Sequence, residues 1–118
     1  MSRIYLAAVA ALAGLALAAA PASAALPKLV ATVGPGFTIT LTKGGTKVKT
    51  LKPGRYTLLI RDKSNIHNFH LKGPGLNKAT SVAFVGNKTM TITLKAGKYT
   101  YVCDPHVSSM KGSFRVTG

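Results

Sequence analysis

The chain has 118 residues, in which 16 lysine and arginine residues face only two acidic ones, giving a formal net charge of +14. Such a field favours acidic proteins and anionic membrane surfaces as partners. Nucleic acid would be attracted too, but the lysines are spread along the chain without a nucleic-acid-binding motif, so we expect no such partner. The single cysteine excludes a disulfide within the chain.

Residues 1–24 have the pattern of a cleavable signal peptide. A charged start precedes an apolar run from Ile4 to Ala20, and Ala22-Ser23-Ala24 fits a small-residue cleavage site. We therefore expect cleavage after Ala24, a periplasmic or secreted protein, and one monomeric domain over residues 25–118. A retained membrane anchor is the alternative, which the shortness of the apolar run disfavours.

Alternating apolar and polar residues predict strands along the mature chain. The segments are residues 37–42, 56–60, 66–71, 89–94, 99–103 and 112–117, with a weaker candidate at 81–85. In the first of them, Phe37, Ile39 and Leu41 would face the core. No helical period follows the leader, so the pattern predicts an all-β fold, an antiparallel β-sandwich or barrel.

One short sequence occurs twice, as TLKPGRYT at residues 50–57 and as TLKAGKYT at residues 93–100. Each copy is typical of a turn that leads into a strand. Aligning the copies sets Ile60 level with Cys103, so we expect the two strands to run toward the same end of the sandwich. Alternatively, hairpin turns favour such residues and the repetition has no further meaning.

Cys103, His106 and Met110 lie on one short loop. A soft thiolate, an imidazole and a thioether suit copper far better than magnesium or calcium. An exported chain with one free thiol is also prone to oxidation, and metal binding would protect that thiol. The loop therefore predicts a metal site.

A second imidazole could come from His67 or His70. On a regular strand the two rings would point to opposite faces, because they are separated by an odd number of positions. His67 shares its face with Phe69 and Leu71, which is the expected inner face. We therefore expect His67, rather than His70, to complete the site.

The spacing His67-Asn68, followed by Cys103-x-x-His106-x-x-x-Met110-Lys111-Gly112, resembles the cupredoxin family, the small blue-copper proteins similar to plastocyanin, pseudoazurin and amicyanin. The resemblance covers nearly all of the mature chain. It implies a Greek-key β-sandwich that holds one copper ion, as Cu(II) or Cu(I), with His67, Cys103, His106 and Met110 as ligands. It also implies that Asn68 ties the two ligand loops together by hydrogen bonds.

The same resemblance implies that electrons leave through an exposed edge of His106, ringed by apolar residues. Four residues are candidates for that ring: Pro74, Leu76, Pro105 and Val107. Two further residues flank the thiolate. Asp104 adds a negative charge that by itself would favour Cu(II), and Pro105 removes a backbone donor from the loop.

We therefore expect an exported carrier of single electrons that docks to an acidic redox partner. Two alternatives are a module that scavenges or delivers copper and a metal-free interaction domain that uses the basic surface. An enzyme is not expected. Three histidines are too few for a multicopper centre, one cysteine is too few for a thiolate-bridged copper pair, and two aspartates do not support a hydrolytic triad.

Overall fold

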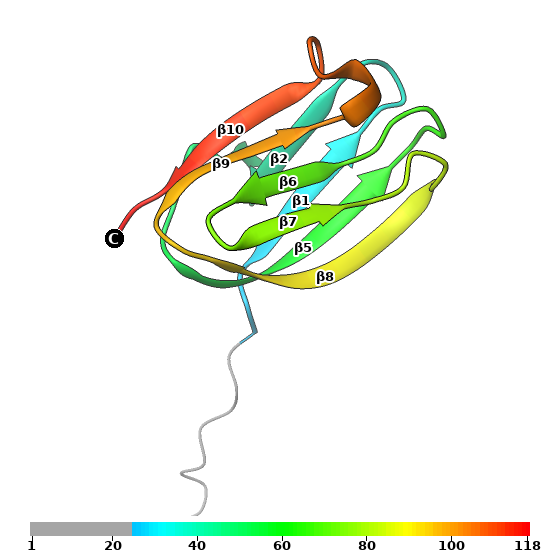
Figure 1. The fold of residues 1–118 in the computed structure, drawn as a ribbon. Coiled ribbons are helices and arrows are strands. Elements are labelled where there is room, and N and C mark those ends of the chain that lie inside the picture. Colours follow the sequence, from blue (N-terminus) through cyan, green and yellow to red (C-terminus); the bar gives the residue numbers. More distant parts are fainter. Residues whose placement is uncertain (1–24) are drawn as a thin grey trace, which may run out of the picture.

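The computed structural model describes residues 25–118, which form two β-sheets packed face to face (Figure 1). The predicted leader, residues 1–24, lies outside the described residues. In chain order the elements are β1 (Lys28–Val33), β2 (Ile39–Lys43), β3 (Thr46–Lys47), β4 (Thr50–Leu51), β5 (Gly54–Asp62), β6 (His70–Gly73), β7 (Leu76–Ala79), β8 (Gly86–Leu94), β9 (Gly97–Val102), the 3-10 turn η1 (Asp104–His106) and β10 (Lys111–Val116).

The strand order is β3-β2-β1-β5-β8 in one sheet and β4-β10-β9-β6-β7 in the other. The predicted all-β sandwich is confirmed, but the sheets are not purely antiparallel. β1 pairs with β5 in parallel, and so does β4 with β10. Both parallel neighbours are separated by long stretches of chain that cross between the sheets, and strand periodicity carries no information on such pairings.

Three local predictions were wrong. The first strand begins at Ile39, and Phe37 is 58% exposed rather than in the core, because the Gly34-Pro35-Gly36 bend carries it outside the sheet. The segment 66–71 becomes a strand only at His70, and residues 81–85 form a loop, with the strand β7 earlier in the chain. β1 was missed altogether, although Leu29, Ala31 and Val33 alternate and are fully buried.

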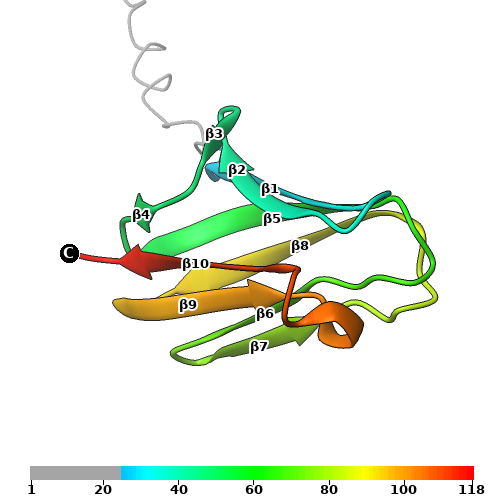
Figure 2. The ribbon, with the colours of Figure 1, turned by 90° about the horizontal axis from the view of Figure 1, so that it is seen from above.

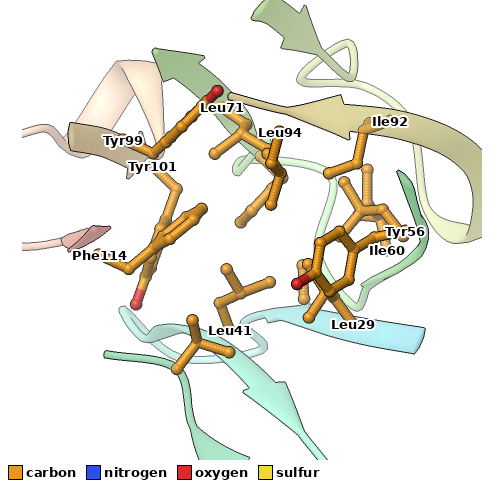
Figure 3. Close-up of a cluster of buried hydrophobic side chains, with 14 of the residues drawn as sticks. Leu29, Leu41, Tyr56, Ile60, Leu71, Ile92, Leu94, Tyr99, Tyr101 and Phe114 are labelled. Atoms are coloured by element: carbon orange, nitrogen blue, oxygen red, sulfur yellow. The ribbon is translucent and has the colours of Figure 1, made fainter. Parts of the chain in front are cut away.

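Aromatic and branched aliphatic side chains fill the space between the sheets (Figure 3). The rings of Tyr99 and Phe114 stack at 5.2 Å, and those of Phe69 and Tyr101 at 5.7 Å. Tyr99, Tyr101 and Cys103 are all buried, which confirms the predicted inward face of β9. These large rings and the aliphatic side chains around them form the core that holds the two sheets together.

The sandwich has two distinct ends (Figure 2). The loops of residues 34–38, 63–69, 80–85 and 103–110 gather at one, here named the metal end, where η1 lies. β4 and the C-terminus lie at the other, the far end. β5 and β9, which follow the repeated sequence, both run toward the metal end, as predicted. Over residues 25–118, no helix is long and apolar enough to span a membrane.

Candidate metal centre

Three metal-ligating side chains meet at the metal end: His67, Cys103 and His106. Cys103 follows the last residue of β9, where strand parity turns its thiol inward, and it is fully buried. His67 is also fully buried and comes from the loop after β5, whereas His106 is half-buried and closes η1. Within residues 25–118 this is the one group of at least three histidine, cysteine or acidic side chains close enough to hold an ion.

The donor atoms form a nearly equilateral triangle. His67 Nδ1 lies 3.2 Å from His106 Nδ1, and Cys103 Sγ lies 3.7 Å and 3.5 Å from these two nitrogens. The point equidistant from all three atoms is about 2.0 Å from each, close to the roughly 2.0–2.3 Å bonds that a transition metal makes to imidazole nitrogen and thiolate sulfur. The residues therefore fit one metal ion without rearrangement, and two imidazoles with a thiolate form the trigonal set that suits copper.

A backbone carbonyl determines which ring nitrogen of His67 carries the proton. Its Nε2 lies 2.9 Å from the oxygen of Gly36. A carbonyl only accepts hydrogen bonds, so Nε2 carries the proton and donates it. In the neutral ring Nδ1 then presents its lone pair to the centre of the triangle, which is the form needed by a ligand.

Met110 is held next to this triangle by its backbone. Its N–H donates to the His106 carbonyl at 2.8 Å, and its own carbonyl accepts the Cys103 N–H at 3.0 Å. The Met110 side chain is fully buried. The loop from Cys103 to Met110 is thus closed on itself by backbone hydrogen bonds, and the buried Met110 side chain belongs to the same loop as the thiolate and the half-buried imidazole.

Asn68 joins the two loops that carry the histidines and the cysteine. Its Nδ2 donates to the Thr80 carbonyl at 3.1 Å and to Asp104 Oδ2 at 2.8 Å, and its Oδ1 accepts the Asp104 N–H at 2.8 Å. Asn68 and the Thr80 carbonyl bond are buried, whereas the two bonds to Asp104 are only partly buried. The loop-tying role that the resemblance implied for this residue is present in the structure.

His70 lies outside the triangle and binds Asp104 instead. Its Nδ1 is 2.9 Å and 3.0 Å from the two carboxylate oxygens, and its Nε2 is 2.6 Å from Asn77 Oδ1. Both ring nitrogens are therefore occupied by groups other than a metal. Burial raises the pKa of the Asp104 carboxyl, but hydrogen bonds from Asn68 and His70 outweigh this effect, and the pKa lies below its ordinary value.

Asp62, the other acidic residue, ends β5 beside the same loops. Its Oδ1 accepts the Ser64 N–H at 3.0 Å, while Oδ2 has no hydrogen-bond partner among the described residues. Burial raises the pKa of this carboxyl above its ordinary value, against the opposing effects of the Ser64 N–H and of nearby His67. Both aspartates of the domain therefore lie at the metal end.

The exposed apolar residues of the domain gather at the metal end, where His106 lies. Four large hydrophobic residues are strongly exposed in the described chain, and all of them lie in metal-end loops: Phe37, Ile66, Val85 and Val107. The Phe37 ring stands edge-on to both imidazoles, with its centroid 5.3 Å from that of His67 and 4.9 Å from that of His106.

The expectation that Pro74 and Leu76 belong to this surface was wrong. They flank the β6–β7 turn at the far end, where the Pro74 carbonyl accepts the Tyr99 hydroxyl at 3.0 Å. Pro105 is exposed beside His106, as expected.

Sequence reasoning missed three supporting groups: the carbonyls of Gly36 and Thr80 and the side chain of Asn77. Two of them act through backbone atoms, which any residue could supply, so no side-chain signal marks them. The alternation of Phe37 with Ile39 and Leu41 predicted a core position for Phe37, so its place beside the imidazoles was missed.

Comparisons with known proteins agree with this geometry. A sequence model described as copper binding proteins, plastocyanin/azurin family, matches residues 38–117. Among solved structures, the copper protein rusticyanin at 2.1 Å resolution matches with a TM-score of 0.57 and 21% identity, covering 76% of each chain. Reduced rusticyanin matches with a TM-score of 0.55 and 25% identity, covering 76% of this chain and 78% of that one. A search of curated proteins finds no significant match.

Proposed function

Because this chain belongs to the plastocyanin/azurin family of copper-binding proteins, we propose that it is an exported carrier of single electrons. A copper ion bound in the triangle would supply the one-electron couple between Cu(II) and Cu(I). His67, Cys103 and His106 would hold the ion through Nδ1, Sγ and Nδ1, and the Met110 thioether would be a fourth, weaker ligand. Such a carrier has no catalytic role of its own.

The observation that carries the proposal is that the donor atoms are already in place. Three distances of 3.2–3.7 Å set a metal-sized gap. Gly36 orients one imidazole, and Asn68 joins the two loops. A frame that changes little between oxidation states lowers the reorganisation that accompanies electron transfer, and it also slows release of the ion. A site whose donors are already in place therefore favours a carrier over a delivery module, which needs an exchangeable ion.

The ring of His106 is the proposed exit for electrons, since it is half-buried whereas His67 and Cys103 are fully buried. Phe37, Ile66 and Val107 surround this end with apolar surface. We propose that a redox partner covers these residues and presents acidic groups to the basic residues at the rim, such as Lys63 and Lys111. Export through residues 1–24 to the periplasm or medium is part of the same proposal.

Two rates on copper-loaded protein separate the candidate functions. A carrier exchanges electrons rapidly with a soluble one-electron reagent and loses copper slowly to an excess of chelator. A copper-delivery protein loses its ion quickly to the chelator, and that result would overturn the proposal even if electron exchange is fast. Asn65→Ala, an exposed change in the His67 loop, is the matched control and should leave both rates unchanged.

A further inference from the structure

The two copies of the repeated sequence bring positive charges together at the far end of the sandwich. They place Lys52 before β5 and Arg55 at the start of that strand, and likewise Lys95 before β9 and Lys98 at the start of that strand. All four side chains are exposed. The two turns are neighbours, because Gly54 pairs with Leu94 across the β5–β8 ladder and Lys95 directly follows.

Two more cations complete a band around the far end. Arg115 lies directly opposite Lys98 in the β9–β10 pair, and the Arg115 N–H donates to the Lys49 carbonyl at 3.0 Å. Lys49 directly precedes β4, and β4 is followed by the turn that carries Lys52. We name this set the cationic end face: Lys49, Lys52, Arg55, Lys95, Lys98 and Arg115. Both sheets contribute to it, and Figure 2 shows β4 and the end of β10 together at this end, away from η1.

No acidic side chain balances these charges. The two aspartates of the described chain, Asp62 and Asp104, lie at the metal end. Like charges directly opposite each other in a sheet, as with Lys98 and Arg115, destabilise the pairing. These charges therefore do not stabilise the fold, but they would attract an anionic partner.

We propose that the cationic end face binds an anionic membrane surface. A protein partner is disfavoured, because protein interfaces have an apolar centre from which lysine is depleted. All the strongly exposed large hydrophobic residues of residues 25–118 lie at the opposite end. A layer of anionic headgroups needs only a broad set of cations, each of which contributes to binding independently. Docking in this way turns the metal end toward water, where a soluble partner can reach His106.

The test uses residues 25–118, which contain every strand pair described above. The chain is mixed with vesicles of phosphatidylglycerol and phosphatidylcholine at an ionic strength of about 0.1 M, and the bound fraction is measured by co-sedimentation. Replacing Lys52, Arg55, Lys95 and Lys98 by glutamine should weaken binding by about fivefold per residue, and so by more than a hundredfold in total.

The matched control removes four cations nearer the metal end: Arg61, Lys63, Lys78 and Lys88 to glutamine. It has the same net charge as the first variant but should bind vesicles within a few-fold of the original chain. Equal losses in both variants would overturn the proposal, since net charge alone would then explain binding. So would equal binding to pure phosphatidylcholine vesicles. Failure to bind vesicles, together with end-face-dependent binding to polyglutamate, would assign the face to acidic proteins instead.

Circular dichroism of each variant checks that the sandwich remains folded, and all eight positions are exposed. The assay needs no copper. Its failure would therefore leave the electron-carrier proposal intact, and failure of the copper site would leave this proposal intact.

Discussion

Replacing Asn68 by alanine should strongly destabilise the domain even without metal. The side chain makes three hydrogen bonds, of 2.8–3.1 Å, between the His67 loop, Thr80 and Asp104. At about 1 kcal/mol for each bond, with an added cost for the buried Thr80 carbonyl left unpaired, the loss is about 2–4 kcal/mol. For a domain of this size that corresponds to a fall in Tm of roughly 10–25 °C.

The assay is thermal unfolding of metal-free residues 25–118 followed by circular dichroism. Asn65→Ala is the control, because Asn65 lies in the same loop but is exposed, and it should change the free energy of unfolding by less than about 0.5 kcal/mol. If Asn68→Ala also costs less than about 1 kcal/mol, the bonds do not hold the loops together, and the explanation for a rigid site fails.

Three further variants test other parts of the structure. Asp104→Asn should reduce stability more at pH 6 than at pH 2.5. The lowered pKa means that the carboxylate stabilises the fold above its ordinary pKa and loses this effect as the pH falls through the folded value, so equal losses in urea unfolding at both pH values would contradict it. Gly73→Ala should cost about 1–3 kcal/mol or more, because a Cβ there would overlap the buried Tyr99 ring, whereas Gly36→Ala, with open space around its Cβ, should cost little. Phe37→Ala should speed copper loss to a chelator with little change in Tm, because this exposed ring covers both imidazoles, and unchanged copper loss would remove its covering role.

The sequence predicted best the features that depend on the alternation of side chains within one strand. Period-two alternation identified β5, β8, β9 and β10, and the inward face of β9 correctly buried Cys103. Long-range pairing was not predictable in this way. The parallel pairs of β1 with β5 and of β4 with β10 depend on how the chain crosses between the sheets, and nothing in a strand's own pattern specifies its neighbour.

His67 and His70 are distinguished in the structure by their hydrogen bonds, and not by strand parity. The structure places His67 with Cys103 and His106, but His67 lies in a loop, so the strand parity used to select it does not apply there. What separates the two residues is their hydrogen bonding. Gly36 orients His67 toward the triangle, while Asp104 and Asn77 occupy both nitrogens of His70. Neither contact can be inferred from spacing along the chain.

The visible absorption spectrum after addition of Cu(II) to residues 25–118 tests the central claim most directly. The proposed site predicts an intense thiolate-to-copper charge-transfer band, because Cys103 Sγ faces the two Nδ1 atoms across a metal-sized gap. His67→Ala should abolish the band, and His70→Ala should retain it. The absence of the band in the folded original chain, or its loss with His70→Ala but not with His67→Ala, would contradict the account.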